Sequence, residues 1–195
     1  MSPARLVALA GVSGAGKDAA AARLAAQHGF VRVALADPLK ETMMELFCLT
    51  REQLWGEGRN VPDPRLGHAP RALYQRFGEV CREIDPEVWL RPFRKRVTDL
   101  LSAGKSVVCT DLRTHAELRM ARELDGSVWL LRRPGAGAPG TMALDRTEAE
   151  LTCVEESSFD AVIWNDGSLD LLSERLDHAL AMTARDIERK PWRTT

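Results

Sequence analysis

A glycine-rich segment, residues 11–18 (GVSGAGKD), constrains the fold of this 195-residue chain more than any other feature. It fits the phosphate-binding pattern G-x-x-x-x-G-K-[ST] at Gly11, Gly16 and Lys17, but Asp18 stands where the pattern has a hydroxyl. An apolar run precedes the segment and an alanine-rich run follows it. A strand, a glycine loop and a helix in that order predict a site for the phosphates of a nucleotide.

The whole chain alternates short apolar runs with longer runs of helical character. The expected strands cover residues 5–10, 30–35, 106–111, 127–132 and 161–165. The expected helices cover residues 17–28, 38–48, 70–83, 86–102, 115–125 and 168–189. Five strands separated by helices predict an α/β, three-layer P-loop NTPase fold, with a five-stranded parallel sheet and helices on both faces. We expect a single domain over residues 1–195, with a loop rich in Gly and Pro at 56–70.

Composition excludes several classes of partner. The 27 Lys and Arg residues are balanced by 28 Asp and Glu residues, giving a net charge of -1 and arguing against a nucleic-acid polymer. An apolar run of 18 residues is absent from the sequence, so we expect no membrane span. The N-terminal residues do not resemble a signal peptide. The four cysteines are dispersed and are expected to be reduced, which favours a cytoplasmic protein.

The glycine loop is expected to hold the phosphates of ATP through its backbone amides and the positive end of the following helix. Lys17 would reach the β and γ phosphates. The residues expected to surround the donor phosphates are Gly11, Ser13, Gly14, Ala15, Gly16, Lys17 and Asp18. The alternative is a Gly-rich turn that caps a helix, with Lys17 in solvent.

Two carboxylates are candidate ligands for Mg²⁺, an ion that prefers oxygen donors. Asp18 lies in the loop itself, and its alternative role is a simple charge at a helix N-terminus. Asp111 ends the run SVVCTD, so it is expected at the carboxyl end of a strand, where ligands bind in open α/β sheets. A role like that of a Walker B aspartate is one interpretation of Asp111, and capping of the next helix is the other.

The acceptor phosphate needs cations of its own, and one predicted helix supplies candidates. Arg71 and Gln75 are four residues apart, and Arg82 follows Gln75 by seven, so the three share a helix face. The arginines suit a phosphate and the amide suits a base edge, although an ordinary solvated helix is the alternative. Trp89 would stack on a base or pack in the core. Arg113, two residues after Asp111, is expected to reach the acceptor phosphate or the transferred group.

Arg133 and Arg146 flank a glycine-rich stretch between two predicted elements. A mobile loop that carries arginines can close over reacting phosphates, exclude water and neutralise charge. We therefore predict a lid at about residues 133–153 with these two arginines in it. The alternative is a surface hairpin.

Several segments together resemble the phage-type deoxynucleoside monophosphate (dNMP) kinases, P-loop phosphotransferases of the wider nucleoside monophosphate kinase group. The segments are GVSGAGKD, ALADPLKE, RALYQRFGEVCREIDPEVWLR, VVCTDLR and VIWNDGSLDLL. They occur in the same order as in that family, and the resemblance extends over most of the chain. A loop that ends in Lys-Asp is a family trait, which explains Asp18. Animal phosphomevalonate kinases share this dipeptide, so the other segments decide the resemblance.

The resemblance implies ATP-dependent phosphorylation of a dNMP to a diphosphate with Mg²⁺. A homodimer is one assembly that such an enzyme could form. It implies an acceptor-binding region at about 38–102, with Asp37 at the sugar or acceptor and Lys40 at a phosphate. Asn165 would border the donor adenine. Two departures are visible: Ala19 replaces the family's usual Thr, and LDRTEAEL replaces its His-x-Ser-Glu motif. The alternatives are a kinase for another phosphorylated small molecule, phosphomevalonate- or dephospho-coenzyme A-like, and a non-catalytic nucleotide switch.

Overall fold

The computed structural model describes residues 4–137 and 154–189. The chain divides into two compact units. The first, here called the sheet unit, comprises residues 1–33 and 97–195, and the second, the helical unit, comprises residues 34–96. The helical unit overlaps most of the region, at about 38–102, that the resemblance assigns to the acceptor.

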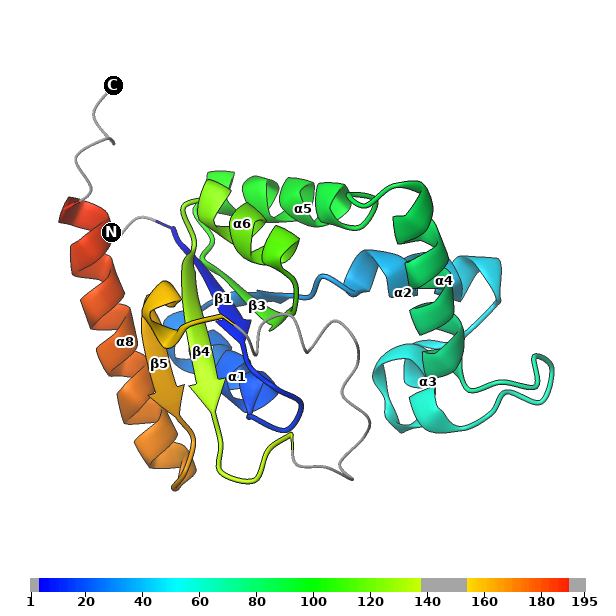
Figure 1. The fold of residues 1–195 in the computed structure, drawn as a ribbon, viewed down its shortest axis with the longest axis horizontal. Coiled ribbons are helices and arrows are strands. Elements are labelled where there is room, and N and C mark those ends of the chain that lie inside the picture. The colour runs from blue at the N-terminus through cyan, green and yellow to red at the C-terminus, as the bar shows by residue number, and fades with distance from the viewer. Residues whose placement is uncertain (1–3, 138–153, 190–195) are drawn as a thin grey trace. The chain divides into compact units, whose positions relative to one another are not determined.

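The sheet unit contains five parallel strands, as predicted. The strands are β1 (Leu6–Ala10), β2 (Val31–Val33), β3 (Val107–Leu112), β4 (Ser127–Arg132) and β5 (Ala161–Trp164). Their order in the sheet is β2-β3-β1-β4-β5, which puts β1 in the middle (Figure 1). The last residue of β1, Ala10, is in register with Leu112 of β3 and Leu130 of β4, so the carboxyl ends of these strands meet at one edge.

Helices cover both faces of this sheet, which confirms the predicted layers (Figure 1). On one face, α1 (Lys17–His28) and α8 (Leu169–Arg189) bury Leu24 and Leu176 in a core that includes Trp129 of β4. On the other face, α6 (His115–Glu123) packs against β4. Burial of these apolar side chains is the main source of the unit's stability.

The helical unit consists of α2 (Asp37–Leu46), α3 (Arg51–Trp55), a 3-10 turn η1 (Glu57–Asn60), α4 (Pro70–Ile84) and the start of α5 (Leu90–Ser102). Its core is a separate apolar cluster, whose buried members are Leu39, Met43, Leu49 and Leu54. Partly buried aromatic side chains, among them Phe77 and Trp89, pack around this cluster.

Several elements differ from the sequence-based expectation, among them η1, which lies in the expected loop at 56–70. The second strand ends at Val33, because the Asp37 carboxylate accepts a hydrogen bond from the backbone N–H of Ala34 (3.0 Å) and draws the chain into a turn. Helix α5 begins at Leu90, since Asp85 accepts the N–H of Glu87 and holds the preceding residues in a turn. Helix α3 was not predicted, although Thr50 and Gln53 form a capping box at its start.

Among the described residues, none of the helices is long and apolar enough to span a membrane. Cys48, Cys81 and Cys109 are free thiols. Cys153 lies outside the described residues.

Candidate functional site

The glycine loop follows β1 and runs into α1, as the sequence pattern requires. Gly11 and Gly16 have positive φ angles of 140° and 97°. A Cβ atom on Gly11 would lie 2.6 Å from the carbonyl oxygen of Leu131, and one on Gly16 would lie 2.2 Å from Nδ2 of Asn165. Both positions therefore require glycine. Ser13 and Gly14 are exposed, whereas Ala15 is buried.

Lys17, the first residue of α1, turns its side chain back over the loop. Its Nζ donates hydrogen bonds to the carbonyl oxygens of Gly11 (2.6 Å) and Val12 (2.9 Å). These bonds hold a positive charge at the loop, beside the N-terminus of α1. A loop of this shape with a lysine in this place can bind the phosphates of a nucleotide.

Asp18 forms an ion pair with Arg32 of β2, with 2.7 Å between Oδ1 and the guanidinium. Both side chains are largely exposed, at 82% for Asp18 and 55% for Arg32. The sequence analysis missed Arg32. The alternation in VRV, in which Val33 is buried and Arg32 exposed, was the available signal for an outward-facing cation.

Asp111 lies near the end of β3, directly before Leu112, whose register partner is the last residue of β1. One of its carboxylate oxygens accepts a hydrogen bond from the thiol of Cys109 (3.6 Å). Burial raises the pKa of the Cys109 thiol well above its usual value, so the thiol keeps the proton that it donates. The N-cap of α6 is Thr114, not Asp111, which leaves the carboxylate of Asp111 outside the cap.

Glu117 completes the cap of α6 and fixes the segment that carries Arg113. Its Oε2 accepts the backbone N–H groups of Arg113 (2.6 Å) and Thr114 (2.9 Å). The pKa of Glu117 is raised to about 7, chiefly by burial; the nearby Asp111 carboxylate adds to the rise, and these N–H groups oppose it. The sequence analysis did not use this residue, although Thr114-x-x-Glu117 is a capping-box signal.

In the helical unit, Asp37 and Lys40 belong to a cluster built around Trp55. The two oxygens of Asp37 accept hydrogen bonds from Nε1 of Trp55 (2.9 Å) and from the N–H of Ala34 (3.0 Å). The Nζ of Lys40 lies 5.4 Å from the ring centroid of Trp55 and 5.5 Å from that of Tyr74. Cations at these distances are attracted to the ring faces. The cluster thus presents a cation on the faces of two aromatic rings, one of which is hydrogen-bonded to Asp37.

Helix α4 carries the other acceptor candidates, Arg71, Gln75 and Arg82. Arg71 and Gln75 are partly buried and Arg82 is exposed. Trp89, in the turn before α5, donates a hydrogen bond from Nε1 to the carbonyl of Gly78 (3.3 Å). Its ring lies 6.4 Å from that of Phe77 and packs against the apolar cluster. These contacts favour packing over base stacking for Trp89.

Only residues 133–137 of the predicted lid lie within the part of the chain that the structure describes. Arg133 follows β4 directly and is exposed. Arg146 and residues 138–153 lie outside the described residues.

Within residues 4–137 and 154–189, there is no group of three or more His, Cys, Asp or Glu side chains that could hold a metal ion. Mg²⁺ in nucleotide sites is commonly bound by one or two carboxylates together with substrate phosphates, and it keeps several waters. Asp18 at the start of α1 and Asp111 at the end of β3 fit that donor set.

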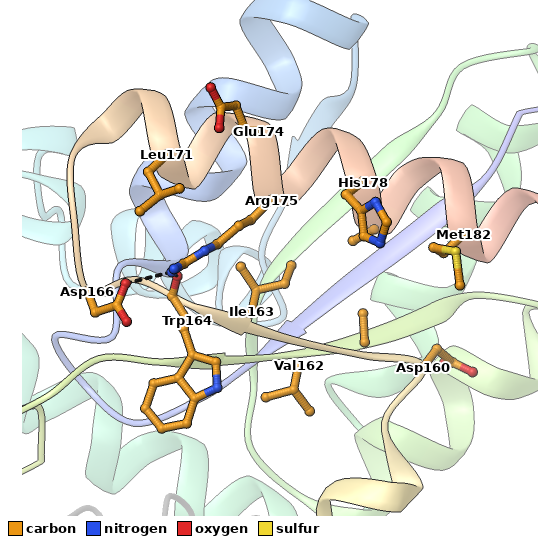
Figure 2. Close-up of a pocket in the computed structure, with 12 residues that line it drawn as sticks. Asp160, Val162, Ile163, Trp164, Asp166, Leu171, Glu174, Arg175, His178 and Met182 are labelled. Carbon is orange, nitrogen blue, oxygen red and sulfur yellow. Dashed lines mark hydrogen bonds and ion pairs between the residues drawn. The ribbon is translucent and has the colours of Figure 1, made fainter.

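A groove of about 740 Å³ lies along β5 and α8 (Figure 2). Its lining includes Trp164, Arg175, His178 and Met182. None of the expected site residues that the structure describes lines this groove. The groove therefore shares none of those residues, although Trp164 and Asp166, the chain neighbours of Asn165, both line it.

Comparison with known proteins gives one family. The family model for deoxynucleotide monophosphate kinase matches residues 68–176, which is more than half of the chain. A protein of Acanthamoeba polyphaga mimivirus, named "Putative deoxynucleotide monophosphate kinase", is 31% identical over 179 residues, covering 85% of this chain and 90% of that protein.

Two solved structures with the same fold are named as kinases. Dephospho-CoA kinase from Campylobacter jejuni aligns with a TM-score of 0.55 at 12% identity, covering 93% of this chain and 98% of that one. The Mycobacterium tuberculosis APS kinase CysC, in complex with AMPPNP and APS, aligns with a TM-score of 0.51 at 13% identity, over 93% of this chain and 99% of that one. At such identities the likeness establishes the P-loop kinase fold alone.

Proposed function

The chain belongs to the deoxynucleotide monophosphate kinase family, and we propose that it transfers the γ-phosphoryl group of ATP to a deoxynucleoside monophosphate. The glycine loop after β1 is the observation that supports ATP as the phosphoryl donor. Two of its positions admit no side chain, and Lys17 is held over it by hydrogen bonds of 2.6 and 2.9 Å. This arrangement supports a polyphosphate donor.

Mg²⁺, held by Asp18 and Asp111 together with the phosphates, would neutralise charge on the transferred group. Lys17 would bind the β and γ phosphates. Arg113 would meet the acceptor phosphate or the transferred group, and its backbone is fixed by Glu117 (2.6 Å). Arg133 and Arg146 are proposed to act from a lid that excludes water, because an open site would hydrolyse ATP.

The acceptor half is proposed for the helical unit. Lys40 would contact the acceptor phosphate and Asp37 the sugar, while Arg71, Gln75 and Arg82 of α4 would contact phosphate and base. The support is chemical: Lys40 lies on the rings of Trp55 and Tyr74 (5.4 and 5.5 Å), and guanidinium groups suit a phosphate dianion.

A coupled ADP-release assay tests the proposal. Purified protein is given ATP and Mg²⁺ with each of dTMP, dGMP, dCMP, dAMP, dUMP and their ribose forms. We expect turnover only when a monophosphate is present, with at least one deoxy form as substrate, and none from the Lys17→Ala variant. ATP binding without turnover on any monophosphate would overturn the acceptor assignment and would point to another phosphorylated acceptor or to a nucleotide switch.

A further inference from the structure

Asn165 stands where β5 ends, and its contacts lead to the glycine loop instead of to solvent. Its backbone N–H donates to the carbonyl of Arg132 (2.7 Å) at the end of β4. Its side-chain Nδ2 donates to the carbonyl of Ala15 (3.0 Å), a residue 150 positions earlier in the chain. The parallel pairing of β4 with β5 thus brings the amide to the last turn of the loop.

The turn that carries Asn165 is held from α8. Arg175 donates to the carbonyl of Trp164 and, at 2.6 Å, to Oδ1 of Asp166 (Figure 2). The residues on both sides of Asn165 are therefore fixed by one guanidinium. A side chain whose backbone is anchored in this way loses little further freedom when it makes its own hydrogen bond.

The loop is built to receive this side chain. Ala15 is fully buried, and Gly16 adopts a φ of 97°. A Cβ on Gly16 would lie 2.2 Å from Nδ2 of Asn165, so the amide fills the space that a side chain would take. The backbone between Ala15 and Lys17 cannot change its conformation without losing the hydrogen bond to Asn165.

We propose that Asn165 is a positioning residue for the donor phosphates. It holds the peptide between Ala15 and Gly16 in its phosphate-binding conformation before a nucleotide arrives, and it acts on the phosphates, not on the adenine. This inference rests on the proposed donor role of the loop. A loop held in its bound conformation loses less entropy when the ligand binds, so its affinity is higher.

The experiment uses a ligand with no base. Isothermal titration measures the Kd of Mg²⁺-ATP and of Mg²⁺-tripolyphosphate for the wild type, Asn165→Leu and Asn165→Ala. We expect both ligands to bind about fivefold more weakly to the variants, by the same factor, which is the effect of one net hydrogen bond. Two variants are used because Leu can overfill the space, whereas Ala leaves it empty. Circular dichroism melting confirms that each variant is folded.

Ser173→Ala is the matched control. The Ser173 hydroxyl donates to Oε1 of Gln27 (2.8 Å), so it joins α8 to α1 far from the loop. We expect this variant to lose about as much stability as the Asn165 variants do. Its Kd values for Mg²⁺-ATP and Mg²⁺-tripolyphosphate should equal those of the wild type.

The outcomes separate the two proposals. If the Asn165 variants bound ATP more weakly than the wild type but bound tripolyphosphate equally well, the positioning role would be overturned. Asn165 would then be an adenine contact. Unchanged values for both ligands would also overturn it. If the wild type bound neither ligand, the donor site itself would be wrong.

Discussion

The two units each hold a lysine in a candidate site, but by different means. Lys17 of the sheet unit is held by two main-chain carbonyls of a loop whose shape depends on glycine. Lys40 of the helical unit is held over the rings of Trp55 and Tyr74, and Asp37 fixes Trp55. The position of the Lys17 ammonium group therefore depends on backbone conformation, whereas that of the Lys40 ammonium group depends on side-chain packing. Substitutions should therefore damage the two sites in different ways.

The largest effect is expected from Gly11→Ala. The new Cβ would lie 2.6 Å from the Leu131 carbonyl at a φ of 140°, and both the contact and the backbone oppose it. Strain of about 1–3 kcal/mol at such a position, added to the clash, predicts a loss of roughly 100-fold in ATP affinity. Isothermal titration measures this loss.

Gly14→Ala is the control for Gly11. Its φ is 80°, but the nearest atom to its Cβ would be 3.9 Å away, so it tests backbone strain without a clash. Equal losses in the two variants would show that contact with Leu131 contributes nothing.

The second effect concerns the helical unit. Trp55→Leu removes the ring under Lys40 and the donor to Asp37. Because a cation on an aromatic face is worth about 0.5–2 kcal/mol, we expect the KM for the monophosphate to rise about tenfold. The KM for ATP should stay within twofold.

Trp55→Phe keeps a ring face and loses the N–H, so the effect on the acceptor KM should be intermediate. Steady-state kinetics with each substrate varied in turn measure both constants. A parallel rise in the KM for ATP would show that the aromatic cluster is not specific to the acceptor.

This difference between the sites also determines what the sequence could predict. The glycine loop lies within eight consecutive residues, and the apolar runs that form the strands are local as well. Each strand therefore falls close to its expected place. Strand β2 is shorter than expected. It ends at Val33, because the Asp37 carboxylate accepts the N–H of the next residue, Ala34. A single side-chain hydrogen bond ended a strand that the apolar pattern continued to residue 35.

The contacts that organise each site join distant residues. Asn165 reaches Ala15 because β4 and β5 pair in one register, and Trp55 reaches Asp37 across 18 residues. Neither contact follows from a local pattern. Arg32 and Glu117 were missed for a different reason, because strand alternation and the Thr-x-x-Glu spacing did point to them.

The third effect is a pH dependence of the sheet unit. The pKa of Glu117 is about 7 in the folded chain and has an ordinary value of 4.5. Between these values the folded state binds more protons than the unfolded state, so stability falls as pH rises toward and past 7. Glu117→Gln removes the titrating group, so we expect the loss in free energy of unfolding between pH 5.5 and pH 8 to be smaller by about 1–2 kcal/mol. The neutral amide can still accept the N–H groups of Arg113 and Thr114, so the cap is kept.

Urea unfolding at pH 5.5 and pH 8 measures this change. The variant should gain stability relative to the wild type at the higher pH. If the two proteins showed parallel pH dependence, the carboxyl group would not titrate in this range.

The smallest effect is expected at the ion pair between Asp18 and Arg32. It depends on neither backbone shape nor packing, since its members are 82% and 55% exposed. Exposed pairs contribute about 0–1 kcal/mol, so Arg32→Gln should change the melting temperature little. Because Arg32 would compete with Mg²⁺ for the carboxylate that is proposed to bind it, the variant should need about twofold less Mg²⁺ for half-maximal ATP binding. Arg32→Lys keeps the charge and should resemble the wild type, and in an Asp18→Asn background the Arg32→Gln change should have no effect. A higher Mg²⁺ requirement in Arg32→Gln would mean that Arg32 binds the phosphates, and Lys17 would then share its role with a side chain outside the loop.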